Sequence, residues 1–221
     1  MTDYVFPPSD PASLPVIGTQ ARFPVRRIYC VGRNYADHVR EMGGDPKRCE
    51  PIIFTKAAEA LVESGCEIRY PPNTSDMHYE VELVVAIGPA GINGGIFGYG
   101  VGIDLTRRDL QATAKSKGAP WSRAKDFAAA APCSDITPAD QVDLSGAHIV
   151  LRQNGEIVQH GRLSDMIWSV EDIIAQIGGD MDLGPGDLIY TGTPDGVGPT
   201  VAGDELEGGI EGLAPIRVRI V

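Results

Sequence analysis

The stretch His78-Tyr79-Glu80-Val81-Glu82-Leu83-Val84-Val85-Ala86-Ile87 decides the fold. It alternates at first and then becomes continuously apolar and rich in β-branched residues, which predicts a buried strand. Side chains two apart share one face of a strand, so Glu80 and Glu82 are expected to point the same way, with their Cα atoms ~7 Å apart. After a Gly-rich turn, residues 98–103 predict a second apolar strand, which ends on Asp104.

Three carboxylates would therefore meet at the ends of two neighbouring strands. Buried carboxylates repel one another unless protons or a cation neutralise them. Oxygen ligands from Glu80, Glu82 and Asp104, with room for water and substrate, suit Mg²⁺ or Mn²⁺. In the alternative interpretation, the glutamates lie on the solvated face of an edge strand and Asp104 caps a helix. The spacing alone leaves both interpretations open.

Composition limits the class of protein. A chain of 221 residues can form one domain with a sizeable core, and its 27 glycines and 17 prolines favour a turn-rich, largely β fold. The net charge of −11 argues against nucleic acid or an anionic membrane as a partner. No apolar run approaches the ~18 residues of a membrane helix, and the N-terminus lacks the order of a signal peptide. Four scattered cysteines indicate neither a zinc site nor a disulfide framework, so we expect a cytoplasmic protein.

The chain divides into a lead-in and a domain. Residues 1–24 contain five prolines and no periodicity, which predicts an extended lead-in on the surface. Residues 25–221 show no internal repeat and no linker, and we expect them to form a single domain. Within it the patterns predict strands at 27–31, 51–54, 188–191 and 216–220, and a hairpin over 148–160 that turns at Asn154-Gly155. They also predict helices at 34–42, 106–117 and 169–177, capped by Asn34, Thr106 and Ser169, the last of which ends at Gly178-Gly179.

Two pairs of polar residues lie three apart on predicted helices. His38 and Glu41 share one helical face, and a carboxylate beside an imidazole fixes its tautomer and raises its basicity. The residues alone favour the plainer alternative, an ordinary surface pair. Arg108 and Gln111 could face whatever Asp104 faces, or could be solvated. Lys125, in a loop that follows, has no meaning by itself.

Five motifs in order give the sequence a resemblance to a known family. They are Gly32-Arg33-Asn34-Tyr35 leading to His38 and Glu41; Glu80-Val81-Glu82; the run 102–109 from Gly102 to Asp109; Trp121 through Lys125-Asp126-Phe127; and the run 191–198 around Thr193-Pro194. Over residues 27–221 the chain resembles the fumarylacetoacetate hydrolase family, and within it the short, single-domain acylpyruvate hydrolase branch.

The resemblance implies a fold and a set of site residues. The implied fold is mixed and mainly β, with short helices around a rolled β-structure, in a homodimer. The implied cofactor is a divalent ion, usually Mg²⁺, with Mn²⁺ or Ca²⁺ able to take its place. The metal ligands would be Glu80, Glu82 and Asp104; the catalytic residues His38, Glu41 and Lys125; and the substrate contacts Lys56, Arg108, Gln111 and Thr193. Family members often have proline after the lysine that matches Lys56, where this chain has Ala57.

The implied activity is hydrolysis of the carbon–carbon bond of an acylpyruvate, with fumarylpyruvate as the leading candidate. The same electron sink would serve an oxaloacetate decarboxylase or a dienoate isomerase, which are the alternatives within the family. The alternative of another class is a binding protein, in which the acidic residues hold Ca²⁺ and catalyse nothing. In such a protein His38, Lys56, Arg108 and Lys125 would have no role.

Overall fold

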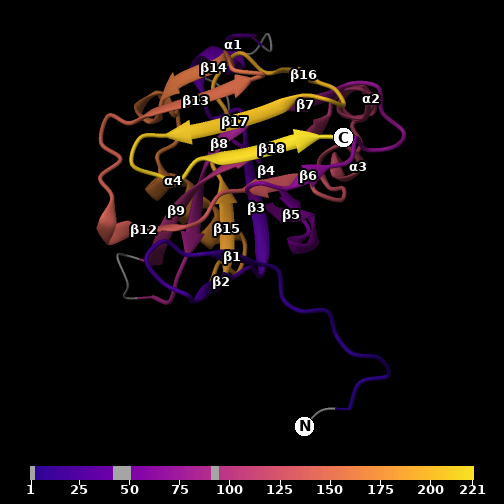
Figure 1. Cartoon of the computed structure of the whole chain (residues 1–221). Helices are drawn as coiled ribbons and strands as arrows, with labels where there is room; N and C mark the ends of the chain where they lie inside the picture. Colours follow the sequence, from indigo (N-terminus) through magenta and orange to yellow (C-terminus); the bar gives the residue numbers. More distant parts are fainter. Residues whose placement is uncertain (1–2, 42–50, 91–94) are drawn as a thin grey trace.

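The computed structural model describes residues 3–41, 51–90 and 95–221 (Figure 1). The fold is mostly β, with curled sheets and few short helices, as predicted. In the described residues the larger sheet has eight strands. They lie in the order β4 (Ile52–Lys56), β3 (Arg27–Gly32), β15 (Asp187–Tyr190), β8 (Val81–Ile87), β9 (Ile96–Ile103), β11 (Ala131–Cys133) and β5 (Leu61–Glu63), with β12 (Thr137–Pro138) beside β9.

A second sheet runs across the first (Figure 1). Its strands lie in the order β14 (Glu156–Arg162), β13 (His148–Gln153), β17 (Glu205–Ile210), β18 (Ile216–Ile220) and β6 (Glu67–Ile68). Smaller sheets are formed by β10 (Thr106–Arg107), β7 (Met77–Tyr79) and β16 (Gly198–Thr200), and by β1 (Ser13–Pro15) with β2 (Arg22–Pro24). The helices are α1 (Ala36–Glu41), α2 (Arg108–Lys117), α3 (Ser122–Lys125) and α4 (Val170–Asp180), with short 3₁₀ turns η2 (Ala58–Ala60), η4 (Ala139–Gln141) and η5 (Leu163–Asp165). None of the described helices is long and apolar enough to cross a bilayer.

Strand β8 is buried on both faces and separates two hydrophobic cores. Its odd-numbered residues, such as Leu83 and Val85, pack into the core between the two large sheets. Val84 and Ala86 pack into the core on the opposite face. Because side chains alternate along a strand, Glu82 belongs to the face of Val84 and Ala86, at the end of that second core.

The strand predicted over 78–87 is interrupted at Glu80. Strand β7 ends at Tyr79 in the three-stranded sheet, and β8 begins at Val81 in the larger one. The chain passes from one sheet to the other at Glu80, whose carbonyl still accepts a hydrogen bond from the Asp104 N–H at 2.8 Å. The interruption therefore leaves the backbones of Glu80 and Asp104 in direct contact.

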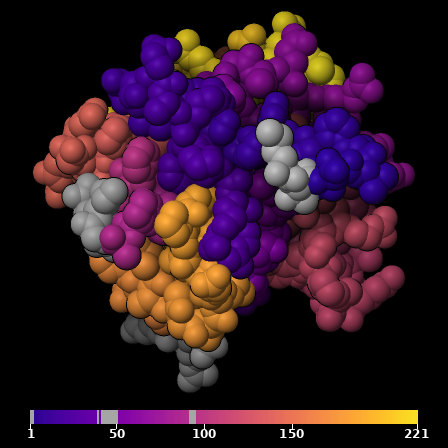
Figure 2. All heavy atoms as spheres, turned by 90° about the horizontal axis from the view of Figure 1, so that it is seen from below, coloured from indigo at the N-terminus to yellow at the C-terminus, as the bar shows by residue number. Residues whose placement is uncertain are grey.

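Residues 13–24 differ from the expected surface lead-in. They form the β1–β2 hairpin, and Leu14 and Phe23 are buried in the second core. The physical reason is that the second core needs a cover, which the alternating apolar residues of this hairpin supply. Figure 2 shows the face of the molecule that carries the N-terminal segment, in indigo. Residues 3–11 are exposed and extend away from the body (Figure 1).

Three helix boundaries also differ from the predictions. The Thr106 hydroxyl does not cap α2, because it is engaged by buried side chains. The side chain of Asn34 does not cap α1, because it bonds to backbone groups of Trp168 and Thr191. Helix α4 runs through Gly178 and Gly179 to Asp180. The hairpin turn at Asn154-Gly155 and the Ser169 cap of α4 are confirmed.

Candidate active site

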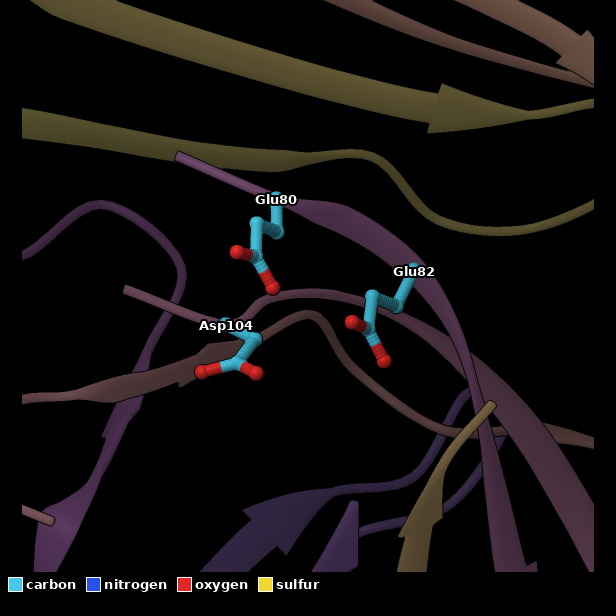
Figure 3. A group of neighbouring side chains, drawn as sticks. All are labelled: Glu80, Glu82 and Asp104. Atoms are coloured by element: carbon cyan, nitrogen blue, oxygen red, sulfur yellow. The ribbon is translucent and has the colours of Figure 1, made fainter. Parts of the chain in front are cut away.

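The carboxylates of Glu80, Glu82 and Asp104 converge (Figure 3). One oxygen from each lies within 4.8 Å of the others, and the three side chains are among the most buried polar groups of the described chain. Glu82 on β8 pairs with Gly102 on β9. A Cβ at Gly102 would lie 2.4 Å from the Tyr190 ring, so glycine is required for the packing beside Glu82.

Three cations surround these carboxylates. Lys125, at the end of α3, donates from Nζ to Glu80 Oε2 at 2.8 Å and to Asp104 Oδ2 at 2.6 Å. Arg108, at the start of α2, donates to Glu80 Oε1 at 2.5 Å. Lys56, at the end of β4, lies 2.8 Å from Asp104 Oδ1, without hydrogen-bond geometry at that oxygen. Three carboxylates therefore face three cations in the interior of a strongly acidic protein.

The two glutamates have opposite electrostatic environments. Burial alone would raise the pKa of Glu80, but the cations of Lys125 and Arg108 outweigh it and hold that pKa below its usual range. Burial, with the neighbouring carboxylates of Asp104 and Glu80, raises the pKa of Glu82 well above its usual range. Within the described residues Glu82 forms no ion pair, so its charge is the least compensated of the three.

A loop between β15 and β16 closes over Glu82. The Gly192 N–H donates to Glu82 Oε2 at 2.8 Å. Gly192 has a φ of 101°, and a Cβ there would lie 2.8 Å from the Cβ of Asn34. Asn34 fixes the loop in turn, because its Nδ2 donates to the Thr191 carbonyl at 2.8 Å. The Asn34 amide and the Gly192 backbone therefore act together to hold Glu82.

The structure brings together most of the residues that the sequence singled out. His38 on α1 is buried and close enough to Glu80 to affect its charge. Glu41 ends the same helix, but its side chain lies outside the described residues, so the expected pairing with His38 stays a prediction. Gln111 is buried and accepts from Arg108 Nη1 at 2.7 Å. The ammonium of Lys56, expected to contact substrate, is engaged by Asp104 and by the carbonyls of Leu105 and Lys125.

Two site residues were missed by the sequence analysis. Gln159, on β14, is buried; its Nε2 donates to Thr193 Oγ1 at 2.9 Å, and its Oε1 accepts from the Val81 N–H at 2.9 Å. It therefore ties the loop that carries Thr193 to the backbone between the two glutamates. Thr106 Oγ1 accepts from Lys125 Nζ at 2.7 Å. Thr106 lies in one of the five motifs, but it was expected to cap a helix. No local pattern indicated the contacts of either residue, because their partners are distant in sequence.

A family model described as fumarylacetoacetate hydrolase, C-terminal, matches residues 27–221 of the chain. The match spans the larger part of the chain and includes every residue of the site described above. The chain belongs to the fumarylacetoacetate hydrolase family. The prediction of an enzyme of this family is thereby confirmed.

Relatives within the fumarylacetoacetate hydrolase family have different named activities. A fumarylpyruvate hydrolase of Ralstonia sp. is 46% identical over 178 residues, which cover 77% of this chain and 93% of the relative. The mitochondrial oxaloacetate tautomerase of Homo sapiens is 40% identical over 203 residues, covering 88% and 91%. A crystal structure of fumarylpyruvate hydrolase from Pseudomonas aeruginosa, in complex with Mn²⁺ and pyruvate, matches with a TM-score of 0.96, 43% identity and 99% coverage of both chains.

The donor set of this family member fits a divalent ion. Hard cations such as Mg²⁺ and Mn²⁺ prefer carboxylate oxygens. Three carboxylates converge here: Glu82 on β8, Asp104 directly after β9, and Glu80 between β7 and β8. The uncompensated charge of Glu82 is the feature that a cation would neutralise. The adjacent ammonium of Lys125 can stabilise negative charge that develops on a ligand beside the carboxylates.

Proposed function

We propose that the chain hydrolyses the carbon–carbon bond of an acylpyruvate, with fumarylpyruvate as the leading candidate. The proposed metal ligands are Glu80, Glu82 and Asp104, with Mg²⁺ or Mn²⁺ as the ion. The observation that carries the proposal is the convergence of these carboxylates around Lys125, whose Nζ contacts two of them at 2.8 and 2.6 Å. The similarity to fumarylpyruvate hydrolases supports the choice of substrate.

Charge balance supports an anionic substrate. Lys56, Arg108 and Lys125 equal the three carboxylates in number before any ion is bound, although their ion pairs are all with Glu80 and Asp104. A bound divalent cation would leave two positive charges in a buried site. An acylpyruvate, with its carboxylate and the negative charge that develops on its keto oxygen, would compensate them.

The reaction requires a base and a group that stabilises an enolate. His38 would take a proton from water as the water oxygen adds to the acyl carbonyl carbon. The bond between that carbon and the pyruvyl methylene then breaks, its electron pair remains on pyruvate as an enolate, and the acyl group leaves as a carboxylate. Protonation of the enolate carbon gives pyruvate. When bound, the ion supplies Lewis-acid stabilisation of the enolate oxygen.

The other polar residues position these groups. Lys125 holds a positive charge next to the carboxylates, where the enolate would form. Arg108 orients Glu80 and is itself held by Gln111. Gln159 holds Thr193, which we propose contacts the substrate. Glu41 is proposed to orient His38.

An activity panel tests the proposal. The purified protein is assayed with fumarylpyruvate, acetylpyruvate and oxaloacetate, in the presence of Mg²⁺ or Mn²⁺ and after chelation with EDTA. We expect metal-dependent release of pyruvate from the acylpyruvates. Absence of pyruvate release from both acylpyruvates, with either ion, would refute the proposed hydrolase.

Oxaloacetate chemistry is the second candidate function. It is favoured by the 40% identity to an oxaloacetate tautomerase over 88% of the chain. Tautomerisation and decarboxylation both pass through an enolate and need no attacking water, so the same carboxylates and Lys125 would serve them. The oxaloacetate arm of the panel, followed by enol absorbance and by CO₂ release, distinguishes these reactions from hydrolysis.

A further inference from the structure

One face of α2 extends from the carboxylates toward solvent. Arg108, Gln111 and Lys115 are spaced by three and four residues, which places them in a row along the helix. Arg108 contacts Glu80, and Gln111 contacts Arg108. Lys115 lies farther along the row, with Nζ 5.1 Å from the centre of the Trp121 ring. Lys115 is exposed, so its ammonium is accessible to a ligand.

A pocket of about 360 Å³ lies between Trp121 and Lys125, the lysine that contacts Glu80 and Asp104. Its lining includes Phe54, Pro120, Trp121 and Lys125. The rings of Phe54 and Trp121 are 5.9 Å apart, and Lys125 Nζ lies 5.0 Å from the centre of the Phe54 ring. The volume is at the small end of ligand sites. The pocket thus has Lys125 at one end and an aromatic wall, and the second cation, Lys115, lies beside Trp121 without lining the pocket.

The length of this row suits a substrate with two carboxylates. Seven residues separate Arg108 from Lys115, a rise of roughly 10 Å along the helix. An extended acylpyruvate with a terminal carboxylate spans roughly 8 Å between its two carboxyl carbons, from ordinary bond lengths. With one end held at the carboxylate cluster, the other end would reach the vicinity of Lys115.

The charge at the Trp121 end is positive and uncompensated. Partial desolvation, together with the cations of Arg108 and Arg33, lowers the pKa of Lys115 although the residue is exposed overall. Neither Lys115 nor Arg33 forms an ion pair with a described residue, although the protein carries a net charge of −11. Arg33 has a φ of +66°, a left-handed conformation that is uncommon for non-glycine residues. A carboxylate from a ligand would compensate this positive charge.

We propose that Lys115 binds the distal carboxylate of the substrate, so that the site prefers acylpyruvates whose acyl group ends in a carboxylate. The inference rests on the proposed function and adds a second recognition point to it. The aromatic wall of Phe54 and Trp121 accommodates the planar, conjugated part of such an acyl group. Arg33 contributes positive charge from the side of α1.

The test compares Lys115→Met with the wild-type protein on two substrates. Fumarylpyruvate has a distal carboxylate and acetylpyruvate has none. We expect KM for fumarylpyruvate to rise by about 10- to 100-fold in the variant, the scale of a lost charge-assisted hydrogen bond. The KM for acetylpyruvate should stay within about twofold of the wild-type value. Lys115→Arg keeps the charge and should retain the preference for fumarylpyruvate over acetylpyruvate. The matched control is Lys117→Met, at an exposed lysine on the same helix, which should change the KM of neither substrate.

A binding measurement separates this inference from the proposed reaction. The Mn²⁺-loaded protein is titrated calorimetrically with 2-oxoheptanedioate and with 2-oxoheptanoate, which have the chain length of fumarylpyruvate and differ in their terminal group. We expect at least ~10-fold tighter binding of 2-oxoheptanedioate by the wild type and loss of that difference in Lys115→Met. Equal binding of both ligands by the wild type, or an equal loss for both in the variant, would overturn the inference. Because no turnover is needed, this result is independent of the hydrolase assay.

Discussion

Glu82 is the carboxylate whose charge depends most on a bound cation. Its neighbours Glu80 and Asp104 are paired with cationic side chains, whereas Glu82 accepts a bond from the Gly192 N–H. Glu82→Gln keeps the shape and removes the charge. We expect the affinity for Mg²⁺ or Mn²⁺ to fall by more than the ~10–100-fold that is usual for residues outside the ligand shell. Isothermal titration of the purified variant measures this.

The matched control for this experiment is Glu205→Gln, an exposed glutamate on β17. It makes the same chemical change away from the site, and its metal affinity should equal that of the wild type. An unchanged affinity in Glu82→Gln, with a normal circular dichroism spectrum, would remove Glu82 from the ligand set.

His38 separates the hydrolase from the second candidate function. Hydrolysis needs an activated water, and a lost general base costs about 10²–10⁴-fold in rate. His38→Ala should therefore reduce acylpyruvate hydrolysis by ~10²-fold or more, and oxaloacetate turnover by less. Both rates are measured on one preparation, after metal binding has been verified.

The exposed His160 of β14 provides the control, since His160→Ala should leave both rates unchanged. Full hydrolase activity in His38→Ala would show that this histidine is structural. An equal collapse of both reactions would show that it orders the site rather than activating water. Glu41→Gln should reproduce a weaker form of the His38→Ala effect if Glu41 orients the imidazole.

At the scale of elements, Gln159 joins three parts of the fold. It lies on β14, accepts from the Val81 N–H of β8, and donates to Thr193 and to the Pro194 carbonyl. Gln159→Leu would leave these buried groups without partners. We expect the free energy of unfolding to fall by about 1–3 kcal/mol, as measured by urea denaturation. The exposed Gln141→Leu is the control, and equal stability of the two variants would contradict the argument.

Local patterns predicted most helices and strands, because these elements depend on interactions between residues that are near in sequence. The alternation Ile216-Arg217-Val218-Arg219-Ile220 appears as a strand with the aliphatic residues buried. Asn154-Gly155 forms its turn with positive φ at both residues. The prediction that Thr106 caps a helix was wrong because its hydroxyl accepts a hydrogen bond from Lys125. Local capping rules do not include a buried ammonium that is distant in sequence. The hairpin of residues 13–24 was missed because its partner is a core built by later residues.

Some residues of the candidate site could likewise be predicted from local patterns, and others could not. Strand periodicity predicted that Glu80 and Glu82 share a face, and the structure confirms that they converge with Asp104. Lys125 could not be assigned from its own loop, because its partners are 21 and 45 positions away. It entered the prediction through the family resemblance. Gln159 entered through neither route.

At the scale of the whole molecule, the N-terminal segment has two parts that contribute differently to stability. Residues 3–11 are exposed, while Leu14 and Phe23 are buried. Removal of residues 1–11 should leave the melting temperature nearly unchanged. Removal of residues 1–24 uncovers the second core and should destabilise the protein by several kcal/mol, at ~1.5–3 kcal/mol per large side chain. Thermal denaturation of both truncations measures the difference, and equal stability would contradict it.

The outer edge of the five-stranded sheet is the basis for a prediction about assembly. Strand β14 ends that sheet, and Ile157 on it is 52% exposed. Exposed edges with apolar residues invite pairing. We propose that a second copy of the chain covers exposed β-structure, giving a homodimer of about twice 23.5 kDa. Light scattering at micromolar concentration that reports the mass of one chain would contradict this.

The parallel pairing of β3 with β15 has a consequence for synthesis. Arg27 pairs with Asp187, so the centre of the larger sheet joins segments about 160 residues apart. At ~5–20 residues per second, the ribosome needs roughly ten to thirty seconds to produce β15 after β3 has emerged. During this interval β3 and β8 have no strand between them, and the loop that holds Glu82 does not yet exist. We therefore expect the nascent chain to remain inactive and to expose apolar strands until β15 has been made.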